Sequence, residues 1–149
     1  ERPEHWQNWP GQGLFFFVLG SWSVLSLFPR RIAIAAIAVL LVGDAFTNIV
    51  GRLWGKIPNP LNRRKTVEGT LAGIVSAFVV LNLFFVWPSA LVAAIIGMIV
   101  EIPTWKIGKF PVDDNLTIPL SVGLILYILA GSIRFLNPYL ENYFWTWFY

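Results

Sequence analysis

The stretch Gly43–Gly55 reads GDAFTNIVGRLWG, and the basic stretch Arg63–Gly69, RRKTVEG, follows it closely. Asp44 lies within a run of residues that is otherwise apolar enough to cross a bilayer. An aspartate at the centre of a membrane helix costs about 2.5–3.5 kcal/mol on insertion scales, so such acids usually have a function. Lys65 and Glu68 then stand where the next apolar run begins. This combination predicts catalysis at a membrane surface.

Composition agrees with a membrane protein. Hydrophobic residues make up 56% of the chain and charged residues 13%, against about 25% charged in soluble proteins. The 149 residues suffice for about five spanning helices with short loops and leave no room for an added soluble domain. No cysteine is present, which excludes disulfides and thiolate metal sites. We therefore expect an all-α, polytopic membrane protein whose residues 1–149 form a single transmembrane domain.

Five apolar segments provide the expected spans. They run Leu14–Phe28, Arg31–Leu53, Val67–Trp87, Ser89–Ile102 and Leu116–Phe135. The second, third and fifth reach the roughly 20 residues that a hydrocarbon core of about 30 Å requires, whereas the first and fourth are short. Pro88 predicts a very short link that makes the third and fourth segments a helical hairpin.

The basic residues orient these spans. One side of the membrane receives Arg2, Arg52, Lys56, Arg63, Arg64, Lys65, Lys106 and Lys109, and the other receives Arg30, Arg31 and Arg134. The positive-inside rule makes the first side cytoplasmic, in a prokaryotic cytoplasmic membrane or an endoplasmic reticulum-type membrane. The two longest polar loops, Trp54–Thr66 and Pro103–Asn115, are then expected to lie together on that side.

The first of these loops suits a polyphosphate, because it is rich in lysine and arginine. Thr66 can cap the following helix and leave amide N–H groups free to attract phosphate. Glu68 beside them indicates a divalent cation, since carboxylates and phosphate oxygens commonly hold Mg²⁺ together. Simpler interpretations stay open: the basic residues could bind anionic lipids, Glu68 could complement the helix dipole, and Asp44 could pair with Arg52.

A third polar cluster consists of Glu101 and the stretch Pro111–Leu120, PVDDNLTIPL. Capping of the last span by Asp114 or Asn115 would explain one of its polar residues. The other polar residues, with Glu101 at the end of the preceding span, favour a second metal-binding or substrate-orienting site.

The remaining motifs are weaker. Gly51 with Gly55, and Gly69 with Gly73, have the spacing of small residues that predicts close helix packing. No nucleophile–histidine arrangement, zinc spacing or Walker sequence is present, so a soluble nucleotide-binding fold is not supported.

The order of the motifs resembles the integral-membrane, CTP-dependent lipid kinases, which include dolichol, phytol and farnesol kinases and CTP-using diacylglycerol kinases. The similar stretches are VGDAFTNIVGRLWG, RRKTVEGTLAG, Glu101 and DDNLTIPL, all between Leu40 and Leu120. The resemblance implies transfer of the γ-phosphate of CTP to the hydroxyl of a membrane lipid alcohol of the polyprenol, dolichol or phytol type. It also implies Mg²⁺ or another divalent cation as cofactor, and no nucleic acid polymer as partner.

The resemblance further implies roles for individual residues. The catalytic residues would be Asp44, Lys65, Glu68 and Asp114. The nucleotide would contact Arg52, Arg63, Arg64, Lys65, Thr66, Gly69 and Asn115. The metal would be held by Asp44, Glu68, Glu101 and Asp114. The identity of the base, the lipid alcohol and the oligomeric state stay open, as does the choice between CTP and another nucleotide on physical grounds.

Two other functions compete with the kinase. Phosphatidate cytidylyltransferases carry runs similar to GRLWGK, Gly51–Lys56, and KTVEG, Lys65–Gly69. Their later histidine–glycine–glycine and aspartate–arginine signature is absent here, whereas DDNLTIPL is present, which favours the kinase. The kinases' upstream arginine–lysine…histidine motif finds no match, so we expect a shortened member or the C-terminal catalytic part of a longer family fold. The non-enzymatic alternative is a small transporter or membrane scaffold.

Overall fold

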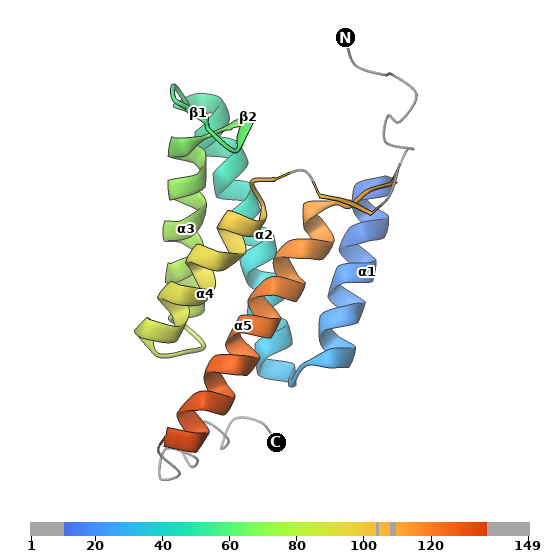
Figure 1. The fold of residues 1–149 in the computed structure, drawn as a ribbon, viewed down its shortest axis with the longest axis vertical. Coiled ribbons are helices and arrows are strands. Elements are labelled where there is room, and N and C mark those ends of the chain that lie inside the picture. The colour runs from blue at the N-terminus through green and yellow to red at the C-terminus, as the bar shows by residue number, and fades with distance from the viewer. Residues whose placement is uncertain (1–10, 104, 108–109, 137–149) are drawn as a thin grey trace.

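The computed structural model describes residues 11–103, 105–107 and 110–136 as a helical bundle with two short β-hairpins at one end (Figure 1). The helices are α1 (Gln12–Leu27), α2 (Arg30–Leu53), α3 (Val67–Leu81), α4 (Trp87–Val100) and α5 (Asp114–Leu136). The antiparallel hairpins are β1 (Pro58–Asn59) with β2 (Asn62–Thr66), and β3 (Lys106–Ile107) with β4 (Phe110–Pro111). The predicted helical segments are thus confirmed, while the hairpins in the polar loops were not predicted.

Helix α2 is the centre of the bundle, because it contacts each of the other four helices. Its buried residues are Ile32, Ala33, Ala35, Ala36, Val39, Leu40, Gly43 and Thr47. Most of them are small, so neighbouring helices can approach closely. Larger side chains from the other helices, such as Leu81, Met98 and Leu126, complete the hydrophobic core around them.

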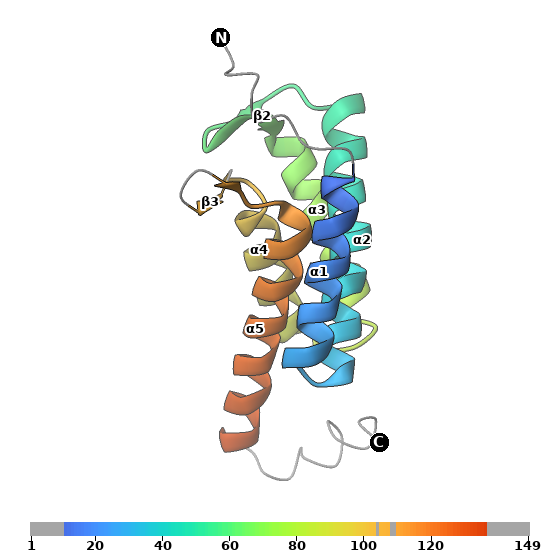
Figure 2. The same ribbon diagram turned by 90° about the vertical axis from the view of Figure 1, so that its right-hand side faces the viewer.

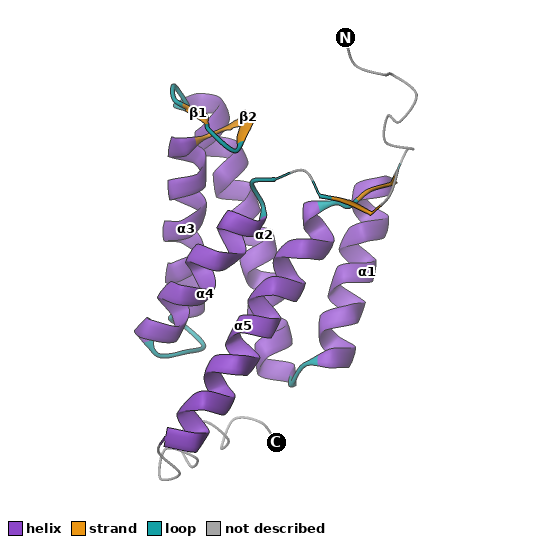
Figure 3. Cartoon of the chain, in the orientation of Figure 1, coloured by secondary structure: helices purple, strands orange, loops and turns teal. Residues whose placement is uncertain are grey.

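The two polar loops lie at the same end of the bundle, as expected (Figures 2 and 3). The β1–β2 hairpin joins α2 to α3, and the β3–β4 hairpin joins α4 to α5. We call this the loop end. The turn at Pro29 and the loop 82–86 form the opposite end, where Arg31 donates to the carbonyl oxygen of Phe84. Arg2 and Lys109, which were assigned to the loop end, lie outside the described residues.

The third and fourth spans differ from their predicted bounds. Helix α3 ends at Leu81 rather than at Trp87, so its 15 residues fall short of the predicted spanning length. Pro88 does not link the helices but lies in the first turn of α4, where its fixed φ and missing N–H are tolerated. Val86, just before that helix, is extended, with φ −62° and ψ 146°. The α3–α4 link is therefore the five-residue loop 82–86.

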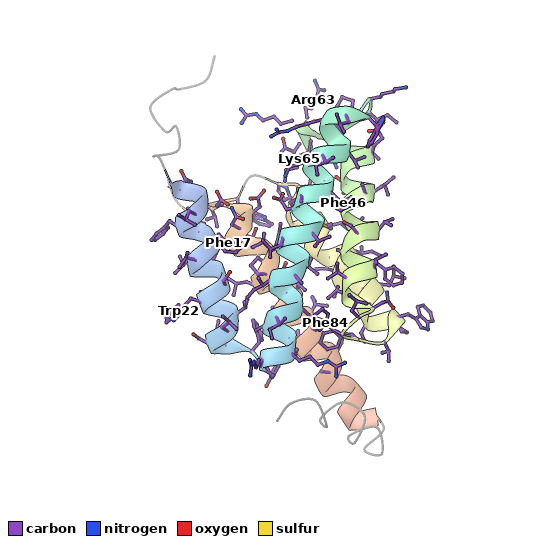
Figure 4. All side chains as sticks on the ribbon, turned by 180° about the vertical axis from the view of Figure 1, so that it is seen from behind. Phe17, Trp22, Phe46, Arg63, Lys65 and Phe84 are labelled. Carbon is purple, nitrogen blue, oxygen red and sulfur yellow. The ribbon has the colours of Figure 1, made fainter. Side chains whose placement is uncertain are left out.

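Of the described helices, only α2 is both long and apolar enough to cross a membrane by length and composition. The other four apolar segments, α1, α3, α4 and Asp114–Ala130 of α5, are shorter. The five-span arrangement therefore stays a prediction. Large apolar side chains are nevertheless exposed on every helix, among them Trp22 on α1 and Phe46 on α2 (Figure 4).

Glycines allow α2 and α3 to pack in close contact along one seam. Gly43, Thr47 and Gly51 follow one another at intervals of four on α2, so they share a face. A Cβ atom on Gly69 of α3 would lie 2.6 Å from the carbonyl oxygen of Thr47, and one on Gly73 would overlap the Thr47 hydroxyl. The close packing predicted from the glycine spacing is confirmed at this seam.

We expect Gly73→Ala to lower the free energy of unfolding by about 1–3 kcal/mol, because the added methyl group has no space against Thr47. Gly13→Ala is the matched control, since its methyl group would meet only Asn115 Nδ2, at 3.8 Å. This control should leave stability unchanged or raise it by up to about 1 kcal/mol. Denaturation of the purified variants in detergent micelles measures both effects. Equal stabilities of the two variants would contradict the packing of this seam.

Candidate functional site

Four segments bring charged side chains together just below the loop end. Asp44 comes from α2, Lys65 from β2, Glu101 from the residue after α4, and Asp114 from the first residue of α5. Carboxylate oxygens of the three acids lie within 4.8 Å of one another. We call these three acids the acid cluster. The structure thus brings together one residue from each polar stretch quoted in the sequence analysis, namely Asp44, Lys65 and Asp114, and adds Glu101 to them.

Lys65 is the cation of this cluster. Its Nζ donates to the backbone oxygen and to Oε1 of Glu101, both at 2.7 Å, and lies 3.4 Å from Oδ2 of Asp114. In Figure 4 its label stands below that of Arg63, on the bundle side of the loop end. One ammonium group opposes three carboxylates, so the cluster keeps an excess of negative charge when all four groups are ionised.

Glu101 is the most buried member, with 3% of the residue exposed. The neighbouring ammonium group of Lys65 offsets the cost of burying this carboxylate. Oε1 accepts from Lys65, and Oε2 accepts from the hydroxyl of Thr47 at 3.2 Å. Both carboxylate oxygens therefore have donors, which keeps this acid ionisable despite its burial and fixes its orientation.

Asp44 is held by its own helix. The side-chain amide of Asn48 donates to Oδ1 of Asp44 at 2.8 Å and to its backbone oxygen at 2.9 Å. The alternative of a structural pair with Arg52 receives no support, because the ion pairs found among the described residues are those of Lys65. Arg52 lies two turns further along α2 and is exposed.

The polar residues at the start of α5 have two different roles. Asp113 Oδ1 accepts from the backbone N–H of Asn115 at 3.0 Å and from its side-chain amide at 2.7 Å. Capping, which was expected of Asp114 or Asn115, is thus performed by Asp113. Asp114 is left to face Lys65. Asn115 also lies 3.5 Å from the backbone oxygen of Gly13, where α1 packs against α5.

Glu68 lies outside the acid cluster. Its carboxylate accepts from the backbone N–H groups of Lys56 and Ile57, at 3.1–3.2 Å. This contact joins the GRLWGK and KTVEG motifs, because the acid of the second holds the backbone that ends the first. The structure therefore gives Glu68 a task in loop geometry, and its role as a metal ligand stays a prediction.

The other residues that were predicted to contact the nucleotide are either exposed or hold the local backbone. The side chains of Arg52, Arg63 and Arg64 are exposed at the loop end. Thr66, by contrast, caps α3, since its Oγ1 accepts from the backbone N–H of Gly69 at 3.2 Å. The expectation that Thr66 caps α3 is confirmed.

Three residues that the sequence analysis did not select support the cluster. Thr47 and Asn48 hold Glu101 and Asp44, and Asn62 of β2 donates to the backbone oxygen of Ile102 at 2.9 Å, tying the first hairpin to the end of α4. The spacing could have revealed the first two, because positions three and four residues after Asp44 lie on its helix face. No signal in the sequence indicates the contact of Asn62.

The chain is similar to proteins named as lipid kinases. It is 30% identical over 134 residues to CTP-dependent diacylglycerol kinase 1 of Schizosaccharomyces pombe, covering 78% of this chain and 60% of that protein. It is 29% identical over 150 residues to a probable chloroplastic phytol kinase of Zea mays, covering 89% of this chain and 47% of that protein. No family model and no solved structure matches the chain.

These relatives confirm the resemblance to the CTP-dependent lipid kinase family. The chain spans 60% of the yeast kinase and just under half of the maize protein.

We expect Lys65→Met to lower the free energy of unfolding by about 3 kcal/mol in the absence of divalent cations. Loss of the ammonium leaves the carboxylate of Glu101 buried without its cation, and breaking such a pair costs about 3–5 kcal/mol. The double variant Lys65→Met with Glu101→Gln removes both charges and should recover at least half of the loss. Chemical denaturation in detergent with a chelator measures all three proteins. An equal loss in single and double variants would show that the pair is not coupled.

We expect Glu68→Ala to increase amide hydrogen exchange in residues 54–60, because the N–H groups of Lys56 and Ile57 lose their acceptor. Glu68→Gln keeps one acceptor oxygen and should give intermediate exchange. Mass spectrometry of peptides covering the hairpin measures the change, with α5 peptides as internal reference. Unchanged exchange in the alanine variant would show that Glu68 does not hold this loop.

Proposed function

We propose that this chain, a relative of the CTP-dependent lipid kinases, transfers the γ-phosphate of CTP to the hydroxyl of a membrane lipid alcohol of the polyprenol, dolichol or phytol type. The observation that carries the proposal is the convergence of Asp44, Glu101 and Asp114 on Lys65, beneath a loop end rich in arginine. The names of the relatives support CTP as the nucleotide and a lipid as the acceptor.

The acid cluster fits a divalent cation. Its ligands are hard carboxylate oxygens, which Mg²⁺ prefers, and its excess negative charge over Lys65 is what a divalent ion would balance. Asp44, Glu101 and Asp114 would hold the ion between them. When bound, Mg²⁺ would neutralise charge on the phosphoryl oxygens during transfer.

The chain's own cations would bind the nucleotide. Lys65 would meet the transferred phosphate, and the exposed Arg52, Arg63 and Arg64 would bind the other phosphates. Such charge neutralisation and positioning supply most of the catalysis in phosphoryl transfer. Contacts from Thr66, Gly69 and Asn115 have less support, because their polar groups hold local structure.

We assign the role of base to Asp44. It lies nine residues before the end of α2, and the described ion pairs of Lys65 are with the other two acids, Glu101 and Asp114. Glu101 and Asp114 both lie at helix ends. Asp44 is therefore the acid left to accept the proton of a lipid hydroxyl, which would enter from the apolar side while the nucleotide enters from the loop end.

The exposed apolar side chains support a position within the lipid bilayer. Large apolar residues lie both inside the bundle and on its outer surface, which suits lipid better than water. The helices of 14–16 residues are about 21–24 Å long, against about 30 Å of hydrocarbon, and the loop after α3 is apolar at residues 83–86. The positive-inside rule supports a loop end that faces the cytoplasm.

Cytidylyl transfer to phosphatidate is the second candidate. The contact of Glu68 with the backbone of Lys56 and Ile57 favours it, because it unites the two motifs that resemble the cytidylyltransferases. The position of the label in the CTP substrate separates the two reactions.

We expect the chain in proteoliposomes with Mg²⁺ to transfer label from γ-labelled CTP into lipid extracts containing a prenol or phytol acceptor. Asp44→Asn and Asp114→Asn should each lower the rate by about 100-fold or more, the usual contribution of a catalytic acid or base. Asp113→Asn is the matched control and should retain most activity, since asparagine caps a helix as well as aspartate.

Label that enters lipid only from α-labelled CTP would establish cytidylyl transfer instead. Full activity of Asp44→Asn would refute the assigned base, and absence of any nucleotide-dependent labelling would favour the transporter or scaffold alternative.

A further inference from the structure

We propose that Thr47 and Asn48 are positioning residues that orient two of the three carboxylates for the divalent cation. The inference rests on the proposed function, because it assigns a supporting role to residues beside the acid cluster. Each residue donates a hydrogen bond to the carboxylate of one acid, Thr47 to Glu101 and Asn48 to Asp44. Both stand one turn after Asp44 on α2.

Thr47 differs from several other hydroxyl residues in the described helices. Ser23, Ser26 and Thr70 donate to the carbonyl oxygen four residues earlier in the chain, the usual arrangement for serine and threonine in a helix. Thr47 instead donates to Glu101, which lies beyond the end of another helix. Its hydroxyl is therefore directed to the acid cluster rather than to its own backbone.

The packing around Thr47 leaves its hydroxyl little freedom. The residue is 6% exposed, and a Cβ atom on Gly73 of α3 would overlap its Oγ1. The Sδ atom of Met98, on α4, also contacts this hydroxyl and lies 3.9 Å from its Oγ1. Three helices thus fix the donor that holds Oε2 of Glu101.

Asn48 acts on the second acid from a more accessible position. Its exposed amide bridges Oδ1 and the backbone oxygen of Asp44, so the carboxylate is restrained relative to its own helix turn. Such outer contacts fix the orientation of metal ligands, and their removal typically lowers metal affinity or activity by about 10–100-fold. The site thus has restrained ligands on α2 and just after the end of α4, and Asp114 lies 3.4 Å from Lys65 Nζ.

The test measures cation binding without nucleotide. Mn²⁺ titration of the purified chain in detergent, followed by electron paramagnetic resonance, gives the affinity directly. We expect Thr47→Val, which keeps the shape and removes the donor, to weaken Mn²⁺ binding by about 10–100-fold. Thr47→Ser, which restores the hydroxyl, should bind within about threefold of the wild type. Asn48→Ala should weaken binding in the same direction, and its exposure makes folding of that variant secure.

A second measurement separates orientation from folding. In a Glu101→Ala background the Thr47→Val change should have no further effect on Mn²⁺ affinity, because the carboxylate that Thr47 holds is gone. Transfer assays should show a raised half-saturating Mg²⁺ concentration for Thr47→Val and a near-normal rate at saturation. A merely structural role would lower the amount of active protein and leave the Mg²⁺ dependence unchanged.

The outcomes distinguish this inference from the proposed function. Wild-type Mn²⁺ affinity in Thr47→Val and Asn48→Ala would overturn the positioning role and leave the kinase proposal intact. A wild-type chain that binds no Mn²⁺ would overturn both the metal site and the positioning role. Weakened binding in Thr47→Ser equal to that in Thr47→Val would also contradict the role of the hydroxyl.

Discussion

The ion pair between Lys65 and the buried carboxylate of Glu101 is the constraint on which the rest of the loop end depends. A carboxylate that is 3% exposed needs a cation and hydrogen-bond donors, or it becomes neutral. Lys65 can supply that cation only if β2 lies against the end of α4, and Asn62 of the same strand makes the adjoining contact. The pair therefore sets the position of the first hairpin, and with it the exposed arginines and the cap of α3.

The small residues of α2 complement this electrostatic constraint. Gly43, Thr47 and Gly51 bring the backbone of α3 close, and the same helix face carries the hydroxyl that reaches Glu101. The face of α2 that packs against α3 is thus the face that donates to Glu101. The distance between α2 and α3 therefore determines where the hydroxyl that orients this acid lies. This coupling explains why a threonine, rather than a third glycine on this face of α2, suits the middle of the seam.

Hydrophobic runs and breakers predicted the helices because those signals are local. The common location of the two polar loops was also predictable, since alternate connections of a bundle lie at the same end. The hairpins were not, because β1, β3 and β4 have only two residues each and β2, NRRKT, is polar throughout, so none shows the apolar–polar alternation that marks a strand. Which acids meet at the site was only partly predictable. Asp44, Glu101 and Asp114 lie together, as expected. Glu68 instead accepts from backbone amides, a contact that no spacing rule indicates.

The loop 82–86 divides the site between two halves of the chain. Asp44 and Lys65 precede it, and Glu101 and Asp114 follow it, so each half carries two of the four charged groups. The halves meet through the contacts of α2 with α4 and α5 and of α3 with α4. If the backbone were cut in this loop, each fragment would carry two of the four charged groups. The complete charged centre would then form only when the two fragments reassociate, so it would report fragment complementation.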